Sequence, residues 1–177
     1  SWIMSLTTLV TFAEVFSVDI NGNKSTKHLL QNAKREPSED RQSANNTIVF
    51  NGRNYHYLPF IYQGTTINKS GDNIESNLIL GNHPLSMAKA QEAVLNKYFV
   101  EVNVCIMKND DIDTLENGSQ SILTTDTWLA ASLSYDPEVV EVLLSSAIDS
   151  VGGNVPSLVL TTEVVGKLPV TSDIQNR

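Results

Sequence analysis

The sequence has 177 residues, 41% of them hydrophobic and 18% charged, which is long enough for one folded domain and ordinary for a globular protein. Its 20 acidic and 12 basic residues give a formal net charge of -8. This balance argues against sequence-independent nucleic-acid binding, because such binding depends on lysines and arginines that release counterions from phosphates. The single cysteine, Cys105, excludes an internal disulfide and every metal or iron–sulfur site built from several cysteines.

The N-terminal region predicts one strand followed by a long loop. Apolar residues alternate in part from Leu9 to Ile20 and stop at an Asn-Gly-Asn turn, with either a bulge or a change of facing expected near Ala13-Glu14. Residues 24–46 are polar, carry both charge signs and hold five basic residues. We expect them to form an extended surface loop, which serves either binding and subunit contacts or no purpose beyond solvation.

A tight hairpin is predicted at Asn51-Gly52, because Asn-Gly between two apolar, alternating runs favours the positive φ angles of such turns. Five of the twelve aromatic residues fall within this region, and we interpret them mainly as core. They are Phe50, Tyr55, Tyr57, Phe60 and Tyr62. Pro59 then predicts an edge or the start of a strand at 60–63.

Two further strand-like arms, 65–67 and 74–80, flank a polar turn, with Ile74, Ser76, Leu78 and Leu80 expected on one face. A helix is predicted over 84–96, since Asn82 is a candidate cap and Pro84 suits a first helical turn. Leu85, Ala88, Glu92 and Leu95 form its predicted row, with Met87, Ala90, Val94 and Tyr98 beside it.

The clearest strand signal covers 99–107, where Val100, Val102, Val104 and Ile106 alternate with polar residues and Cys105. Residues 108–126 are predicted to be a second extended loop. Their carboxylates do not keep the calcium-loop spacing, because Thr114 stands where an EF-hand needs glycine. A second hairpin is expected from 127–135 and 138–145 around Asp136-Pro137, followed by a β-rich piece at 158–165.

Together these signals predict one domain over residues 1–177, mainly β, an antiparallel β-sandwich or barrel with one packed helix and extended loops at 24–46 and 108–126. No run is apolar and long enough to span a bilayer, and the first residues lack signal-peptide features, so we expect neither a membrane partner nor secretion.

Nothing in the sequence predicts catalysis, a cofactor or a metal site. His28, His56 and His83 are isolated from one another, so no metal-binding histidine pair exists, and each is interpreted as structural. The sequence contains no nucleophile elbow, phosphate-binding loop or dinucleotide fingerprint. A pair of distant carboxylates, as in glycosidases, is neither indicated nor excluded by sequence.

The order of several segments resembles the phage minor tail protein L family, the tail-tip hub proteins of lambda-like long-tailed phages. The resemblance covers most of the chain and rests on these segments, in chain order: Phe16-Ser17-Val18-Asp19-Ile20, Phe50-Asn51-Gly52-Arg53-Asn54-Tyr55, Tyr57-Leu58-Pro59-Phe60, Leu78-Ile79-Leu80-Gly81-Asn82, Leu144-Ser145-Ser146-Ala147-Ile148-Asp149 and Val155-Pro156.

This resemblance implies a structural, non-enzymatic role in a virion, assembled in the host cytoplasm, with a fold like that of the tail tube. It implies a trimeric or hexameric ring around the central channel, between tail tube and tip or baseplate. Its partners would be copies of itself and other tail proteins, with DNA present only in transit. Lambda-type members carry a cysteine-bearing C-terminal region that holds an iron–sulfur cluster, whereas Cys105 is alone here, so the cluster is not carried over.

Two charged segments, 24–46 with its basic residues and the acidic 108–126, are the predicted contacts between neighbouring copies. The acidic excess is also expected to keep DNA from adhering to a channel wall. The alternative is a carbohydrate- or ligand-binding β-sandwich in which Trp2, Tyr55, Tyr57 or Trp128 stacks on a sugar. A hydrolase with distant carboxylates is a third and weaker possibility.

Overall fold

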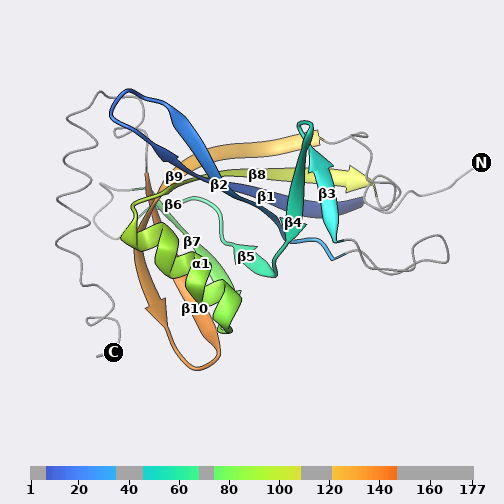
Figure 1. The fold of residues 1–177 in the computed structure, drawn as a ribbon. Coiled ribbons are helices and arrows are strands. Elements are labelled where there is room, and N and C mark those ends of the chain that lie inside the picture. Colours follow the sequence, from blue (N-terminus) through green and yellow to red (C-terminus); the bar gives the residue numbers. More distant parts are fainter. Residues whose placement is uncertain (1–6, 35–45, 68–73, 109–120, 147–177) are drawn as a thin grey trace, which may run out of the picture. The chain divides into compact units, whose positions relative to one another are not determined.

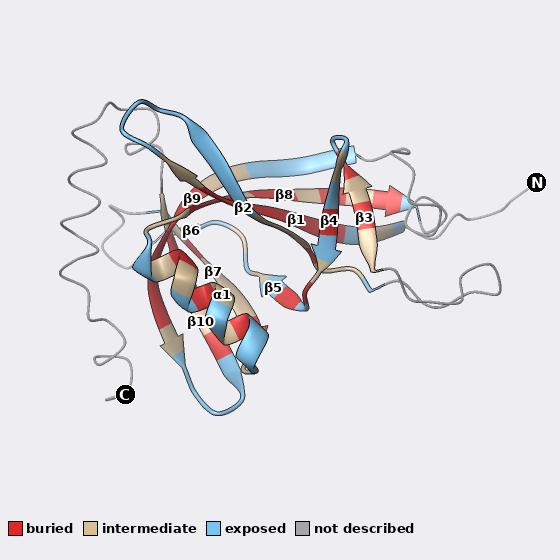
Figure 2. Ribbon diagram, in the orientation of Figure 1, coloured by how far each residue is buried: buried red, intermediate tan, exposed pale blue. Residues whose placement is uncertain are grey.

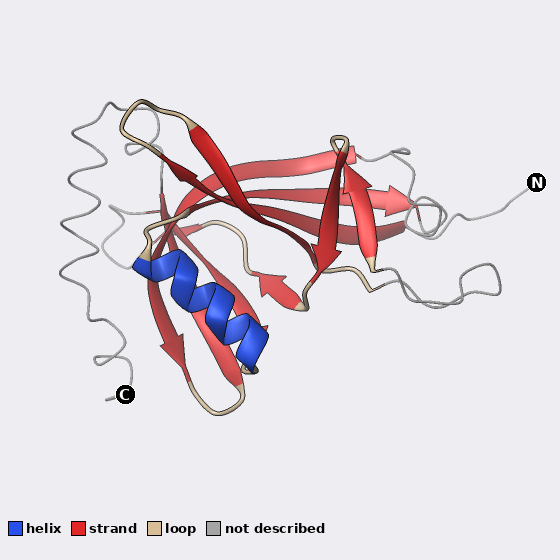
Figure 3. Cartoon of the chain, viewed as in Figure 1, coloured by secondary structure: helices blue, strands red, loops and turns tan. Residues whose placement is uncertain are grey.

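The computed structural model describes residues 7–34, 46–67, 74–108 and 121–146. Within these ranges the protein is mainly β, with one helix and a mixed sheet, which confirms the predicted fold class (Figures 1 and 3). The elements, in chain order, are β1 (Thr7–Val18), β2 (Lys24–Gln31), β3 (Thr47–Phe50), β4 (Arg53–Tyr57), β5 (Phe60–Tyr62), β6 (Thr66–Ile67), β7 (Ile74–Gly81), α1 (Pro84–Leu95), β8 (Phe99–Lys108), β9 (Ser121–Tyr135) and β10 (Val139–Ser146).

The strands follow the hydrogen-bonding order β3-β4-β2-β1-β8-β9-β10-β7-β5, and β6 also pairs with β7. Contacts within the chain gather into two compact units. Of the described residues, unit 1 contains 7–14, 28–34 with 46–59, and 102–108 with 121–126, and unit 2 contains 15–27, 60–67 with 74–101, and 127–146. Each is therefore assembled from three separate stretches of sequence. The single domain remains a prediction.

In unit 1 the predicted hairpin is confirmed. β3 and β4 pair antiparallel with Phe50 opposite Arg53, and the two turn residues have φ angles of 51° at Asn51 and 74° at Gly52. Two successive positive φ values define the hairpin turn that matches the twist of the strands it joins. The turn therefore sets the register that sends Ile48, Phe50 and Tyr55 inward.

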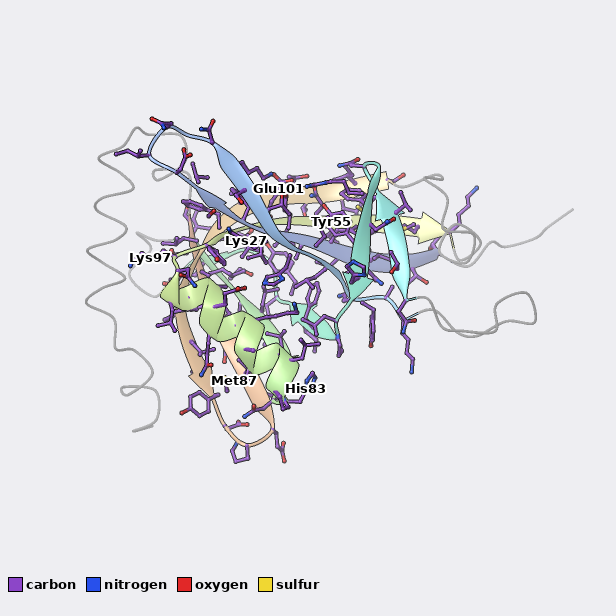
Figure 4. All side chains as sticks on the ribbon, viewed as in Figure 1. Lys27, Tyr55, His83, Met87, Lys97 and Glu101 are labelled. Atoms are coloured by element: carbon purple, nitrogen blue, oxygen red, sulfur yellow. The ribbon has the colours of Figure 1, made fainter. Side chains whose placement is uncertain are left out.

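The core of unit 1 is built around three aromatic rings. Phe12 stacks on Phe50 with ring centroids 4.3 Å apart, and Tyr55 meets both rings edge-on at 5.2 and 5.6 Å. Figure 4 labels Tyr55 beside β4. Val10, Ile48, Cys105 and Met107 complete the same buried cluster. The aromatic residues around the hairpin thus serve the core, as predicted for Phe50 and Tyr55.

The first part of the predicted 24–46 loop is a strand instead. β2 runs from Lys24 to Gln31 and pairs in parallel with β4, so the sheet is mixed rather than purely antiparallel. The fully buried Gln31 explains why a polar segment enters the sheet. Its Nε2 donates to the Asn46 carbonyl at 3.1 Å, while its Oε1 accepts the Ala33 N–H at 2.6 Å. Burying an amide costs little free energy when both its nitrogen and its oxygen are hydrogen-bonded, and these two bonds fix the end of the strand.

In unit 2, β10 pairs antiparallel with both β9 and β7, and the other edge of β7 pairs with β5 and β6. The predicted arms 65–67 and 74–80 are thereby confirmed as β6 and β7, and 60–63 as the terminal strand β5. Asp136 forms the turn into β10: its carboxylate accepts the N–H groups of Glu138 and Val139 at 2.7 and 2.8 Å. These hydrogen bonds lower the pKa of Asp136.

The helix is where the sequence predicted it, but its buried face is different. Ser86, Ala90 and Ala93 are buried, whereas Leu85 and Leu95 of the predicted row are 56% and 76% exposed. Small side chains let the helix approach the β7–β10 sheet, against which it packs (Figure 1). The predicted apolar row is therefore wrong: the buried face of the helix consists of serine and alanine side chains, and the leucines are exposed.

Both ends of the helix differ from expectation. The N-cap is His83 rather than Asn82, and Asn82 instead donates from Nδ2 to the Asp136 carbonyl at 2.6 Å. At the other end Lys97 has a φ of 57°, and the N–H of Tyr98 reaches back to the Ala93 carbonyl at 2.9 Å. This is the hydrogen-bond pattern that commonly closes helices, here without the usual glycine.

β8 confirms the predicted strand but corrects its faces. Val100 and Val102 are buried as expected, whereas farther along the strand Asn103, Cys105 and Met107 are buried instead. The buried side thus changes between Val102 and Asn103, beside the boundary at which β8 passes from unit 2 to unit 1. β1 has no such change, because every residue from Val10 to Phe16 is buried.

β9 is longer than the predicted 127–135, and its added residues 121–126 are a strand rather than part of a loop.

Several expectations concern residues outside the described ranges. These are the remainder of the two predicted loops at 35–45 and 109–120, the polar turn at 68–73, and the β-rich piece at 158–165. β7 also corrects one face: Ser76 and Leu80 are buried, whereas Ile74 is 41% exposed.

Candidate functional site

The titratable residues that the structure describes do not gather into a recognisable chemical centre. Among them there is no group of three or more His, Cys, Asp or Glu side chains that could hold a metal ion. In the same ranges no helix is long and apolar enough to cross a membrane. The candidate features are therefore an ion pair with a buried carboxylate, a hydrogen-bonded aromatic pair and two exposed segments.

The buried ion pair lies in unit 1, where Arg53 donates from Nη1 to Glu14 Oε2 at 2.9 Å. The Glu14 side chain is 2% exposed and that of Arg53 41% exposed, so the guanidinium covers a carboxylate buried in the sheet. Arg53 also lies over the Tyr55 ring, 6.0 Å from its centroid. The hydrogen bond to Glu14 raises the pKa of Arg53.

This geometry suits a structural link rather than catalysis. A catalytic acid or base needs a pKa near the working pH and access to substrate, whereas Glu14 is held against a permanent cation and covered by it. The sequence predicts no ion pair for Glu14, because a lone glutamate in an apolar run gives no local sign of its partner 39 residues away.

The aromatic pair, made of the buried Trp128 and the half-buried Tyr62, belongs to unit 2. Trp128 is 2% exposed and donates from Nε1 to the Tyr62 hydroxyl at 2.9 Å. This removes Trp128 from the candidate sugar platform, because stacking on a sugar requires an open ring face. Tyr55, at 2% exposed, is excluded by the same argument. Of the remaining two, Tyr57 is half-buried and Trp2 lies outside the described residues.

The first exposed segment is the tip of the β1–β2 hairpin, with every residue from 19 to 27 exposed (Figure 2). Asp19 orders this tip. Its carboxylate accepts the N–H groups of Asn21 and Asn23 at 2.9 and 2.8 Å, and its own N–H donates to the Asn23 carbonyl at 3.0 Å. The backbone hydrogen bond from Asn23 is the main reason that the pKa of Asp19 is lowered.

Two lysines attach the same hairpin to its own unit. The Lys24 ammonium lies 4.3 Å from the centroid of the Phe16 ring, and that of Lys27 lies 5.8 Å from the Tyr98 ring. Figure 4 labels Lys27 on this arm. Ile20 at the tip is 73% exposed. The hairpin is therefore an ordered, protruding arm that carries an apolar side chain at its end.

The second exposed segment is the first part of β9 in unit 1. Ser121 to Thr125 are all exposed, including Ile122 and Leu123 at 51% and 52% (Figure 2). The segment is held on one side by β8, where the Thr125 hydroxyl donates to Asn103 Oδ1 at 2.6 Å. As far as the structure describes the chain, β10 pairs with β9 from Trp128 to Tyr135 and does not reach this segment.

Among the described residues, the three histidines and the cysteine belong to no metal-binding group. The ring of His56 lies 3.3 Å from the Thr47 hydroxyl, and the ring of His83 lies 3.1 Å from the Ser86 hydroxyl. Cys105 is fully buried, and burial raises its pKa to about 11. The expectation that Cys105 is an ordinary buried thiol is therefore confirmed.

No protein-family model matches the sequence, and no curated protein is significantly similar to it.

Proposed function

We propose that this protein is a structural subunit of a phage tail, which assembles with copies of itself into a trimeric or hexameric hub or adaptor ring around the tail channel. The observation that carries the proposal is the ordered hairpin arm at residues 19–27, because an exposed arm with an apolar tip is what a subunit needs to reach its neighbour. The mainly β fold with one helix accords with the role implied by the family resemblance.

The net charge favours the same role. A net charge of -8 suits a wall along which DNA must slide without adhering. Polar groups inside the described residues form links such as Glu14–Arg53 and Trp128–Tyr62, which hold strands together. We therefore assign the protein a structural role, in which subunits bind one another and neither a substrate nor a cofactor takes part.

The arm provides a direct test. Ile20→Asp places a charge on the exposed tip, and Leu95→Asp is the matched control, because Leu95 is equally exposed, at 76% against 73%, but lies at the end of α1. Light scattering and electron microscopy of the full chain should show rings of three or six copies. Ile20→Asp should shift the protein to monomers, and Leu95→Asp should leave the rings intact.

The alternative role gives a different result in the same preparations. A wild-type chain that stays monomeric at high concentration and binds glycans on an array would refute the ring and support a carbohydrate-binding module. A ring that forms equally well with Ile20→Asp would refute the arm as its contact. Gold-labelled antibodies that mark the tail tip of intact particles would test the location directly.

A further inference from the structure

Within the residues that the structure describes, β10 does not pair with the first part of β9, and this exposed edge carries neither lysine nor proline. Edge strands are commonly protected by lysine, proline, an inward-pointing charge or a bulge. The run Ser121-Ile122-Leu123-Thr124-Thr125 contains no charge and no proline, and two of its side chains are large and apolar. The sequence has 32 charged residues, 12 basic and 20 acidic, and none of them lies in this run. The run is therefore well suited to pairing with another strand.

We propose that this edge pairs with the same edge of a second copy, in antiparallel register around a two-fold axis at Leu123. Two antiparallel strands related by a two-fold axis perpendicular to the sheet must place one residue opposite itself, and Leu123 is the centre of the five exposed residues. Leucine then meets leucine, Ile122 meets Thr124, and Ser121 meets Thr125.

The charges around the edge favour a second copy as the occupant. Asp126 lies just beyond the five-residue run, so this register brings no two carboxylates face to face, although the protein as a whole is strongly acidic. Like charges directly opposite each other on neighbouring strands are destabilising, whereas β-branched and hydroxyl pairs are favourable. The run therefore carries no charge that would oppose self-pairing, and its side chains are of types that pair well across strands.

This contact goes beyond the proposed ring and does not depend on it. A ring closes through head-to-tail contacts, whereas a two-fold contact joins copies in pairs. Five residues from each copy bury less than the roughly 1,000 Å² that a stable interface needs, so the contact is expected to be weak on its own. Covalent trapping is therefore the appropriate measurement.

The test is oxidative cross-linking of full-length variants in native buffer. Leu123→Cys should form a disulfide-linked dimer, because residues directly opposite each other have Cα atoms about 4.5–5.5 Å apart, within the range for a disulfide. Ser121→Cys should not link to itself, because its two copies are offset by about four residues, or roughly 13 Å. A mixture of Ser121→Cys with Thr125→Cys should form the heterodimer. Wild type, with only the buried Cys105, is the background.

A lysine on the edge completes the test. Adding Thr124→Lys to Leu123→Cys should lower the dimer yield at least about tenfold, whereas Thr7→Lys, on the exposed start of β1, should leave it unchanged. The proposal is overturned if Leu123→Cys links no faster than Ser121→Cys, if the mixture gives no heterodimer, or if both lysines have equal effects. Circular dichroism of each variant confirms that the fold is retained.

Discussion

The ion pair between Glu14 and Arg53 makes a quantitative prediction about stability. Arg53→Met removes the guanidinium and leaves a carboxylate that is 2% exposed without its cation. Removing one partner of a buried pair costs about 3–5 kcal/mol. Because the Arg53 side chain is 41% exposed, water can reach part of the vacated space, and we expect a smaller loss of about 2–3 kcal/mol.

The loss is measured by urea unfolding followed through tryptophan fluorescence, since Trp128 is buried in the folded protein. For a chain of this size it corresponds to a fall in Tm of roughly 4–12 °C. Lys108→Met is the control, because it removes the same charge from an exposed strand end and should change the free energy of unfolding by less than about 0.5 kcal/mol.

A double-mutant cycle separates the pair from other effects. Glu14→Gln keeps the side-chain volume and should cost about 1–2 kcal/mol, since a hydrogen bond to a charged group is replaced by a weaker one. Glu14→Gln combined with Arg53→Met should be less destabilising than the sum of the two, because no uncompensated charge remains. Additive effects, or an Arg53→Met variant within about 0.5 kcal/mol of wild type, would refute the reasoning.

Three more predictions concern the turns and the thiol. Gly52→Ala should lower the free energy of unfolding in urea by about 1–2 kcal/mol, because the φ of Gly52 is 74°. No atom lies within 4 Å of the new Cβ, so the loss comes from backbone strain alone. Gly81→Ala, at a residue without a positive φ, is the control and should be nearly neutral. The lowered pKa values of Asp19 and Asp136 mean that their contribution to stability is present above the unfolded value near 3.9 and lost as pH falls through the folded value. The double variant Asp19→Asn with Asp136→Asn should therefore lose less Tm than wild type between about pH 4 and pH 2, and an unchanged slope would contradict this. Cys105, with a pKa of about 11, should react with a thiol reagent at pH 8 only after unfolding, and rapid labelling of the native protein would contradict its burial.

Local signals predicted the elements that local chemistry determines. Asn51-Gly52 specified a turn that needs two positive φ angles, and Pro84 marked the start of the helix. The alternation after Phe99 identified a strand. In each case the deciding interaction lies within a few residues, so the sequence pattern is sufficient.

The features that depend on distant partners were missed. β2 has the polar composition of a loop, and what makes it a strand lies far along the chain: it pairs with β4, and Gln31 donates a hydrogen bond to Asn46. Val104 and Ile106 were assigned to the buried face because one strand was assumed to have one inner side, yet β8 changes sides. The burial of Glu14 depends on its ion pair with Arg53, and a partner 39 residues away cannot be read from the local sequence.

The composition of the two units limits how the molecule can be dissected. Each unit draws on three separated stretches, and β1, β2, β8 and β9 each begin in one unit and end in the other. No single cut in the chain can release either unit whole, so shortened fragments would lose pieces of both. Point substitutions on the intact chain are therefore the way to assign roles to the hairpin arm and to the exposed edge of β9 separately.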